Sequence, residues 1–122
     1  MSYITTIGNL VATPELRENE KGGKYAYARI AVSDRVRLGD EWVDSPTTFY
    51  TVTLNGRDAE AVVAIAQASG NVRLVVTGER STKAYKPEGS DEIRFENRIH
   101  ADEVGVSLRG QDVHVTLRGR QQ

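Results

Sequence analysis

Residues 24–33 constrain the fold more than any other segment, because small or apolar residues alternate there with larger polar ones without a break. Ala26, Ala28, Ile30 and Val32 fall on one side of an extended chain, and Tyr25, Tyr27, Arg29 and Ser33 fall on the other. Successive side chains of a β-strand point to opposite faces of the sheet. The alternation therefore predicts a strand with one buried face.

Four further segments have strand character: 3–11, 47–54, 72–77 and 92–101. In 47–54, Tyr50, Val52 and Leu54 alternate with Phe49, Thr51 and Thr53, and all six residues favour strands. In 92–101, the side that carries Ile99 also carries Ile93, Phe95 and Asn97. Residues 35–46 predict a polar loop or flexible hairpin, and Gly78 predicts a bulge or a close approach of two backbones.

The period changes between residues 55 and 70, where apolar residues recur at helical spacing: Ala59, Val62, Val63 and Ala66. This pattern predicts one short helix. Asn55 is expected to cap its start, and Gly70 is expected to end it in the left-handed conformation that other residues resist.

The resulting order is strand, strand, strand, helix, strand, strand. This is the order of the OB-fold, a five-stranded Greek-key barrel with its helix between strands three and four. The sequence therefore predicts an all-β OB-fold domain over residues 1–106. Residues 107–122 are too few for a second core, and the alternation over 112–117 predicts an extra C-terminal strand, at a sheet edge or as a clamp between subunits.

Composition narrows the possible chemistry. The 122 residues fit one compact domain, and the absence of cysteine excludes disulfides, thiolate zinc sites and cysteine nucleophiles. No apolar run approaches the roughly 18 residues of a membrane-spanning helix, and residues 1–10 lack the pattern of a signal peptide, so a cytoplasmic location is expected. The formal net charge of −1 argues against nucleic-acid binding unless cations gather on one face.

Four segments, in order, resemble the landmarks of bacterial single-stranded DNA-binding proteins. They are Ile7-Gly8-Asn9-Leu10 followed by Pro14-Glu15-Leu16-Arg17, then Gly22-Gly23 before the alternating strand, Thr48-Phe49-Tyr50-Thr51-Val52-Thr53-Leu54-Asn55-Gly56, and Gly78-Glu79-Arg80-Ser81-Thr82-Lys83-Ala84-Tyr85. The resemblance covers residues 3–104.

This resemblance implies a non-enzymatic homotetramer of OB-folds, associated with the nucleoid, that holds single-stranded DNA during replication, repair or recombination and needs no cofactor. Bases would stack on aromatic rings, and lysine and arginine would contact phosphates. Phe49 and Tyr85 fall where the family commonly places stacking tryptophans. Arg57 and Lys83 fall where it commonly places basic residues.

The sequence departs from the family pattern in two places. Val36 stands near a position that is often tryptophan, and Asn55 stands where phenylalanine is common. These departures predict a weaker or specialised binder unless Trp42, Tyr27 or extra phosphate contacts compensate. Typical members also end in an acidic peptide that recruits other proteins, whereas residues 117–122 are basic and polar. The sequence therefore predicts either a truncated chain or a paralogue without that recruiting tail.

The candidate DNA-binding side chains each have a structural alternative. Phe49 points away from the core residues of its strand, so it could stack on bases or fill a subunit interface. Tyr85 lies among Arg80, Lys83 and Lys86 in a predicted hairpin, which would be a cationic arm or simply a solvated loop.

Two further groups of candidates are more ambiguous. Arg35 and Trp42 share the 35–46 loop with several acidic residues, which dilute its positive charge. Tyr27 and Arg29 share one strand face that could line a DNA groove or pack across a dimer interface.

The sequence offers little for metal binding or catalysis. His100 and His114 have no partners at ligand spacing, so no metal site is predicted. Adjacent acids, as in Asp91-Glu92, would face opposite sides of a strand rather than converge. The alternatives to DNA binding are an oligomeric OB-fold protein-interaction module with weakened DNA binding and, less favoured, a small nuclease.

Overall fold

The structure is a computed structural model that describes residues 2–119. Over these residues the chain forms one helix and eight strands. In chain order they are β1 (Ser2–Leu10), β2 (Arg17–Glu18), β3 (Lys24–Val32), β4 (Arg35–Leu38), β5 (Glu41–Asp44), β6 (Thr48–Asn55), α1 (Gly56–Ser69), β7 (Arg73–Tyr85) and β8 (Arg94–Val106). The one helix in the described part of the chain, α1, is too short and not apolar enough to cross a membrane.

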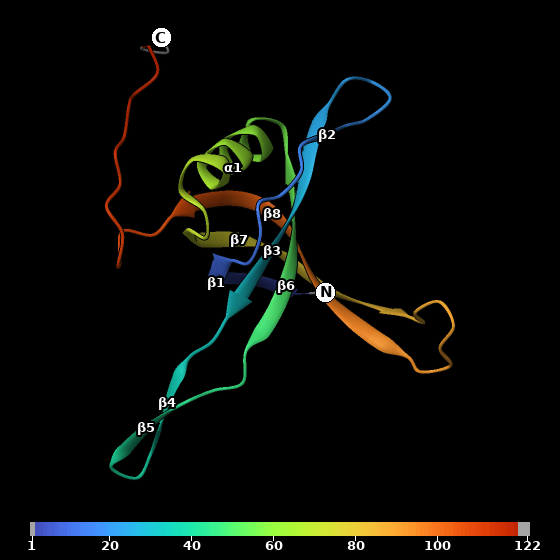
Figure 1. Ribbon diagram of the computed structural model, residues 1–122, viewed down its shortest axis with the longest axis vertical. Coiled ribbons are helices and arrows are strands. Elements are labelled where there is room, and N and C mark those ends of the chain that lie inside the picture. The colour runs from blue at the N-terminus through green and yellow to red at the C-terminus, as the bar shows by residue number, and fades with distance from the viewer. Residues whose placement is uncertain (1, 120–122) are drawn as a thin grey trace.

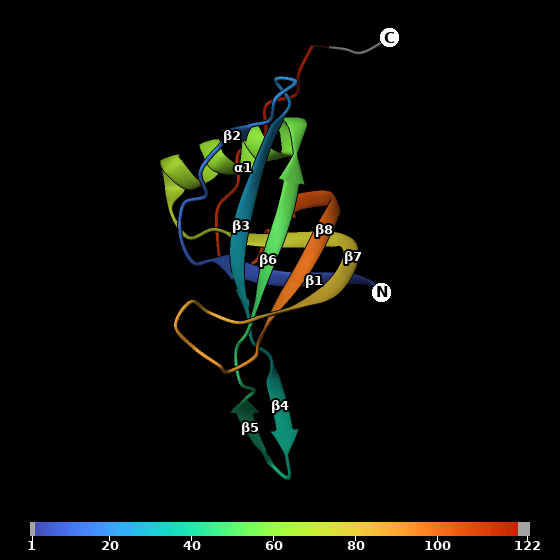
Figure 2. The same ribbon diagram turned by 90° about the vertical axis from the view of Figure 1, so that its right-hand side faces the viewer.

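The five long strands close into a barrel. Their order is β1-β7-β8-β6-β3, and β1 also pairs with β3, which completes the ring. The pairings are antiparallel except that of β6 with β8, which run parallel. With α1 between β6 and β7, this is the predicted OB-fold order, and that prediction is confirmed. Figures 1 and 2 show α1 at one end of the barrel.

The core follows the period-two pattern of the sequence. Inward residues of β3 and β6, such as Ile30 and Leu54, are fully buried, and Leu74, Val76 and Ile99 complete the barrel interior. Burying a side chain of this size contributes roughly 1.5–3 kcal/mol. Helix α1 covers the core with the four residues that its period predicted: Ala59, Val62, Val63 and Ala66.

The helix ends agree with the sequence on one side only. Gly70 ends the helix, as expected, with a positive φ of +82° that other residues resist, but its ψ of −136° lies outside the left-handed helical region; its N–H donates to the carbonyl of Ala66 at 2.8 Å. Asn55 occupies the N-cap position with extended backbone, but its side chain makes no capping hydrogen bond. The predicted Asn55 side-chain cap is therefore wrong; the chain passes from β6 into the helix through Gly56, whose φ is +58°.

Gly78 is both a bulge and a point of close contact. The register between β7 and β8 shifts between Thr77 and Gly78. A Cβ placed on Gly78 would lie 2.1 Å from the carbonyl oxygen of His100. Only glycine lets the two strands approach this closely, so the prediction made for this position is confirmed.

Two arms extend from the barrel on the side away from α1 (Figures 1 and 2). One is the β4–β5 hairpin, a separate two-stranded sheet that occupies the predicted loop or hairpin at 35–46. The other is the far end of the β7–β8 hairpin, which is paired as far as Tyr85 and Arg94. Both arms therefore begin close to where β6 enters the barrel.

Residues 107–119 depart from the sequence interpretation. The predicted strand over 112–117 is not formed in this single chain, where β8 ends at Val106 and irregular backbone follows. A strand needs a partner, and here residues 111–114 run beside α1, where they share a cavity with Ile65 and Ala68. Pairing of this segment with another subunit stays a prediction, as do the domain boundary at 106 and the role of the segment as a clamp.

Candidate nucleic-acid interface

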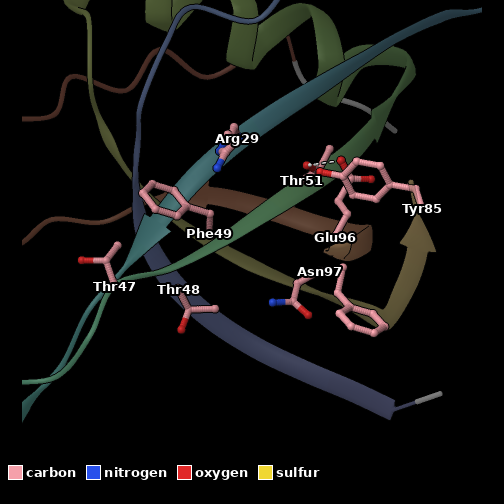
Figure 3. A pocket seen from close by; sticks show the side chains of 9 residues that line it. Arg29, Thr47, Thr48, Phe49, Thr51, Tyr85, Glu96 and Asn97 are labelled. Atoms are coloured by element: carbon pink, nitrogen blue, oxygen red, sulfur yellow. Dashed lines mark hydrogen bonds between the residues drawn. The ribbon is translucent and has the colours of Figure 1, made fainter. Parts of the chain in front are cut away.

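A groove of about 390 Å³ opens where the β7–β8 arm leaves the barrel. This volume is within the range of sites that hold small organic ligands, roughly 300–1,000 Å³. The groove is lined by Arg29, Thr47, Thr48, Phe49, Thr51, Tyr85, Phe95, Glu96 and Asn97 (Figure 3). It lies where β6 and β8 separate, since their parallel pairing begins at Tyr50 and Asn97.

Three aromatic rings surround this groove, each from a different strand. Phe49 is on the outward face of β6, where it stands opposite Ala31 of β3. Tyr85 is the last residue of β7, and Phe95 is on β8. Phe49 and Tyr85 are each 43% exposed and Phe95 is 68% exposed, so all three rings are accessible from the groove side. Two of them, Phe49 and Tyr85, are candidates from the sequence.

Phe95 is the functional candidate that sequence reasoning missed. Its spacing placed it on the side of β8 that carries Ile99, which is fully buried. However, β8 extends beyond the barrel before residue 97, and there the inward side has no core to cover it. The length of the hairpin could have revealed this. Its polar turn lies around Pro87 and Gly89, so the strand residues next to the turn extend beyond a barrel of this size.

Arg29 fixes the position of Phe49. Its guanidinium carbon lies 4.6 Å from the centroid of the Phe49 ring, which is a cation–π contact. The two residues come from neighbouring strands and share the outward sheet face. Arg29 thus places a positive charge against the Phe49 ring in the lining of the groove, and the ring stays partly exposed.

Tyr27 lies farther along the same outward face, and it does not line the groove. It is about half exposed, and its ring contacts that of Tyr25 edge to face, with centroids 5.7 Å apart. A role for Tyr27 as a DNA contact or as a subunit contact stays a prediction.

Hydrogen bonds order the floor of the groove. The Glu96 carboxylate accepts from the Arg98 Nε and, at 3.4 Å, from the Thr51 hydroxyl. The Asn97 Oδ1 accepts from Arg80 at 3.2 Å. Arg80 therefore acts here by orienting Asn97, and it does not line the groove itself.

Lys83 and Lys86 are on the β7–β8 arm, before and after Tyr85 in the chain, and neither lines the groove. Lys83 is exposed and stands opposite Glu96 in the β7–β8 pairing, and Lys86 is exposed in the loop that follows Tyr85. Neither lysine belongs to an ion pair within residues 2–119. Both charges are therefore available to a phosphate.

Arg57 is placed elsewhere. It is exposed in the first turn of α1, after the last residue of β6, whereas Phe49 is near the first. The structure therefore does not bring Arg57 into the groove, although the outward face of β3 and β6 connects the two positions.

The β4–β5 arm carries Arg35 and Trp42, also outside the groove. Trp42 is exposed, while Arg35 is 3.7 Å from the Asp44 carboxylate and donates to the Trp42 carbonyl. Arg37 and Asp40 form a second ion pair on this arm, at 4.0 Å. These acids largely neutralise the arm, as the sequence indicated.

The sequence matches the model of the Single-strand binding protein family over residues 1–107. The single-stranded DNA-binding protein of Corynebacterium glutamicum is 39% identical over 121 residues, which are 95% of this chain and 52% of that protein. Single-stranded DNA-binding protein 2 of Streptomyces coelicolor is 35% identical over 94% of this chain and 57% of its own length.

The crystal structure of a small single-stranded DNA-binding protein from Streptomyces coelicolor has the same fold, with a TM-score of 0.72 and 27% identity. The match covers 88% of this chain and 94% of that one. The chain thus spans about half the length of the two curated relatives above, and the match to the family model includes the whole barrel. The chain belongs to the single-strand binding protein family.

Proposed function

We propose that this chain binds single-stranded DNA with little dependence on sequence and protects it during replication, repair or recombination in the cytoplasm. The observation that carries the proposal is the groove itself, in which Phe49, Tyr85 and Phe95 are exposed around one opening. Unpaired bases have apolar faces that any aromatic ring can cover, and such stacking contributes about 1–3 kcal/mol per base. The relatives named above are described as single-stranded DNA-binding proteins, which supports the same function.

Phosphate contacts would come from cations around these rings. Arg29 lines the groove, and Lys83 and Lys86 lie outside it on the β7–β8 arm, close in the chain to Tyr85. Arg57 would extend the contact toward α1, along the outward face of β3 and β6. Because the chain as a whole has a net charge of −1, its DNA binding depends on this local placement of cations.

We also propose that the protein works as a homotetramer. The outward side of β1 exposes two large side chains, Tyr3 and Ile7, beside Val75 of β7. Exposed apolar side chains that are grouped on one sheet face commonly mark a subunit interface. This face is separate from the groove, so assembly through it would leave the rings open to DNA.

One observation favours a second function, that of a protein-interaction module. The β4–β5 arm exposes Val36, Leu38 and Val43, and its arginines are paired with acids. Asn55 also offers no ring to a base. If the groove binds DNA only weakly, this arm would be the principal binding surface of the oligomer.

A fluorescence titration separates the two functions. Trp42 is the only tryptophan, so its emission and that of the tyrosines can be followed as oligothymidine is added across a salt series. Single-stranded DNA binding predicts saturable quenching, preference over duplex DNA, and an affinity that falls steeply with salt. A stable oligomer with no measurable affinity for oligothymidine at physiological salt would favour the interaction module.

A further inference from the structure

Two tyrosines on β3 form a second aromatic surface outside the groove. The rings of Tyr25 and Tyr27 meet edge to face, with centroids 5.7 Å apart and an interplanar angle of 72°. Both side chains are on the outward face of β3, because they alternate with the buried Ala26 and Ala28. Tyr27 is still 51% exposed. Edge-to-face contact favours one arrangement of the two rings, so Tyr27 presents an oriented aromatic surface to solvent.

The side chains around this pair are polar rather than apolar. In the pairing of β3 with β6, Tyr27 stands opposite Thr53 and Arg29 stands opposite Thr51. Thr53 is in turn paired with His100 of β8, which is exposed. Subunit interfaces commonly group apolar side chains on one face, as the outward side of β1 does. The surroundings of Tyr27 therefore suit an unpaired nucleotide, which has an apolar base and a charged backbone, better than a second copy of the chain.

Arg29 connects the tyrosine pair with the groove. It follows Tyr27 by two residues on the same face of β3, about 7 Å farther along the strand, and its guanidinium carbon lies 4.6 Å from the centroid of the Phe49 ring (Figure 3). Phe49 stands opposite Ala31, so Tyr27 and Phe49 are separated by about 13 Å along β3. Arg29 forms no ion pair within residues 2–119. A cation thus lies between two exposed rings, which is the combination that sequence-tolerant binding of a single strand uses.

The direction of the strands defines a path for the DNA. Figure 2 shows β3 and β6 side by side between the arms and α1. The groove is at the arm end of this face. Tyr27 is nearer the helix, because its neighbour Tyr25 stands opposite Asn55, which α1 follows directly. A DNA strand that leaves the groove past Arg29 therefore reaches Tyr27 before it reaches the first turn of α1.

We infer that Tyr27 is a second stacking site for single-stranded DNA, separate from the groove and held in orientation by Tyr25, so that the bound strand runs lengthwise along β3 and β6. This inference rests on the proposed function, because it requires that the groove binds the same strand. It gives the DNA a defined path across the barrel, and it assigns Tyr27 to DNA rather than to a subunit contact.

Photochemical cross-linking tests the inference on the unmodified protein. Oligothymidine in which 5-iodouracil replaces thymine forms covalent adducts with aromatic side chains that lie against the base, and mass spectrometry of the peptides locates them. We expect adducts on Tyr27 as well as on the rings of the groove. Adducts on Phe49, Tyr85 or Phe95 with none on Tyr27 would overturn the inference and leave DNA binding intact. Failure of the oligomer to bind would instead refute the proposed function.

Two substitutions of Tyr27 measure the contribution of its ring. Tyr27→Phe keeps the ring, whereas Tyr27→Leu keeps only apolar bulk. With oligothymidine of about 16 nucleotides, Tyr27→Leu should bind roughly 5- to 150-fold more weakly than Tyr27→Phe, the range for one stacked base. With an oligomer of about four nucleotides, which the three rings of the groove would hold, the two variants should bind equally.

The same two variants can also contradict the inference. Equal affinity at both lengths would show that the ring of Tyr27 does not stack on a base. A smaller oligomer of Tyr27→Leu than of Tyr27→Phe, measured by light scattering without DNA, would show that Tyr27 is a subunit contact instead.

Discussion

The side-chain amide of Gln111 pairs with the backbone of Arg73 as a neighbouring strand would. Its Oε1 accepts from the Arg73 N–H at 3.1 Å, and its Nε2 donates to the Arg73 carbonyl at 3.0 Å. The Ser107 N–H donates to the same carbonyl, also at 3.0 Å. One side chain thus ties the segment after β8 to the start of β7 without a strand in that segment.

Replacing Gln111 with alanine should release this segment. Two hydrogen bonds at the β7 backbone are lost, so we expect about 1 kcal/mol of destabilisation and faster amide exchange in residues 107–114. Gln67→Ala, on the exposed side of α1, is the matched control. Unchanged exchange in the Gln111 variant would show that the segment is held by its packing against α1.

Deleting residues 110–122 tests whether the segment also acts between subunits. The segment that follows β8 carries three exposed apolar side chains, those of Leu108, Val115 and Leu117. The deletion removes the last two of them. If Val115 and Leu117 contact another subunit, the shortened protein should dissociate at higher concentration and melt at lower temperature than Gln111→Ala, which removes only the tie within the chain. Light scattering and thermal melting measure both, and unchanged values would contradict the clamp role of residues 107–122.

Gly78→Ala should destabilise the barrel strongly. The new methyl group would meet backbone atoms of His100 and Ala101, which cannot move without opening the β7–β8 pairing. We expect a loss of about 3 kcal/mol in the free energy of unfolding, at the upper end of the cost of overpacking. Gly105→Ala, on β8, has open space around it and should change stability little. Urea denaturation of the two variants measures the difference.

Most of the barrel could be predicted from the sequence because its strands obey a local rule. Ile30, Val52 and Ile99 are buried where alternation places them, and the helix buries its periodic face. The rule requires a core beneath the strand. It therefore failed at Phe95, where β8 has left the barrel and the same alternation leads to an exposed ring.

The site was predictable only in part, since it depends on which strands meet. Single residues such as Phe49 and Tyr85 could be chosen from resemblance and facing direction. The contact of Arg29 with the Phe49 ring depends on the pairing of β3 with β6, which the sequence does not state. Arg57 was chosen by the same resemblance, and yet the fold places it outside the groove.

Phe95→Ala should weaken binding to oligothymidine as much as Phe49→Ala does. Each substitution removes one stacking surface from the groove, worth about 1–3 kcal/mol, or roughly 5- to 150-fold in affinity. The salt dependence should stay the same, because no cation is removed. Ile93→Ala is the control, as Ile93 is exposed nearby but does not line the groove. Equal affinity in Phe95→Ala and Ile93→Ala would exclude Phe95 as a stacking surface.

Lys83→Gln should change the salt dependence of binding, whereas Arg35→Gln should change it little. Each phosphate contact with a single strand adds about 0.7 to the slope of log affinity against log salt, because bound counterions are released. Lys83 has no ion-pair partner within residues 2–119, but Arg35 already faces Asp44 at 3.7 Å. A cation paired within its own chain gains less from a phosphate, so the slope should fall by about 0.7 only for Lys83. If the slope falls equally in the two variants, the DNA backbone contacts both arms. If neither slope falls and the affinity is also unchanged, it contacts neither arm.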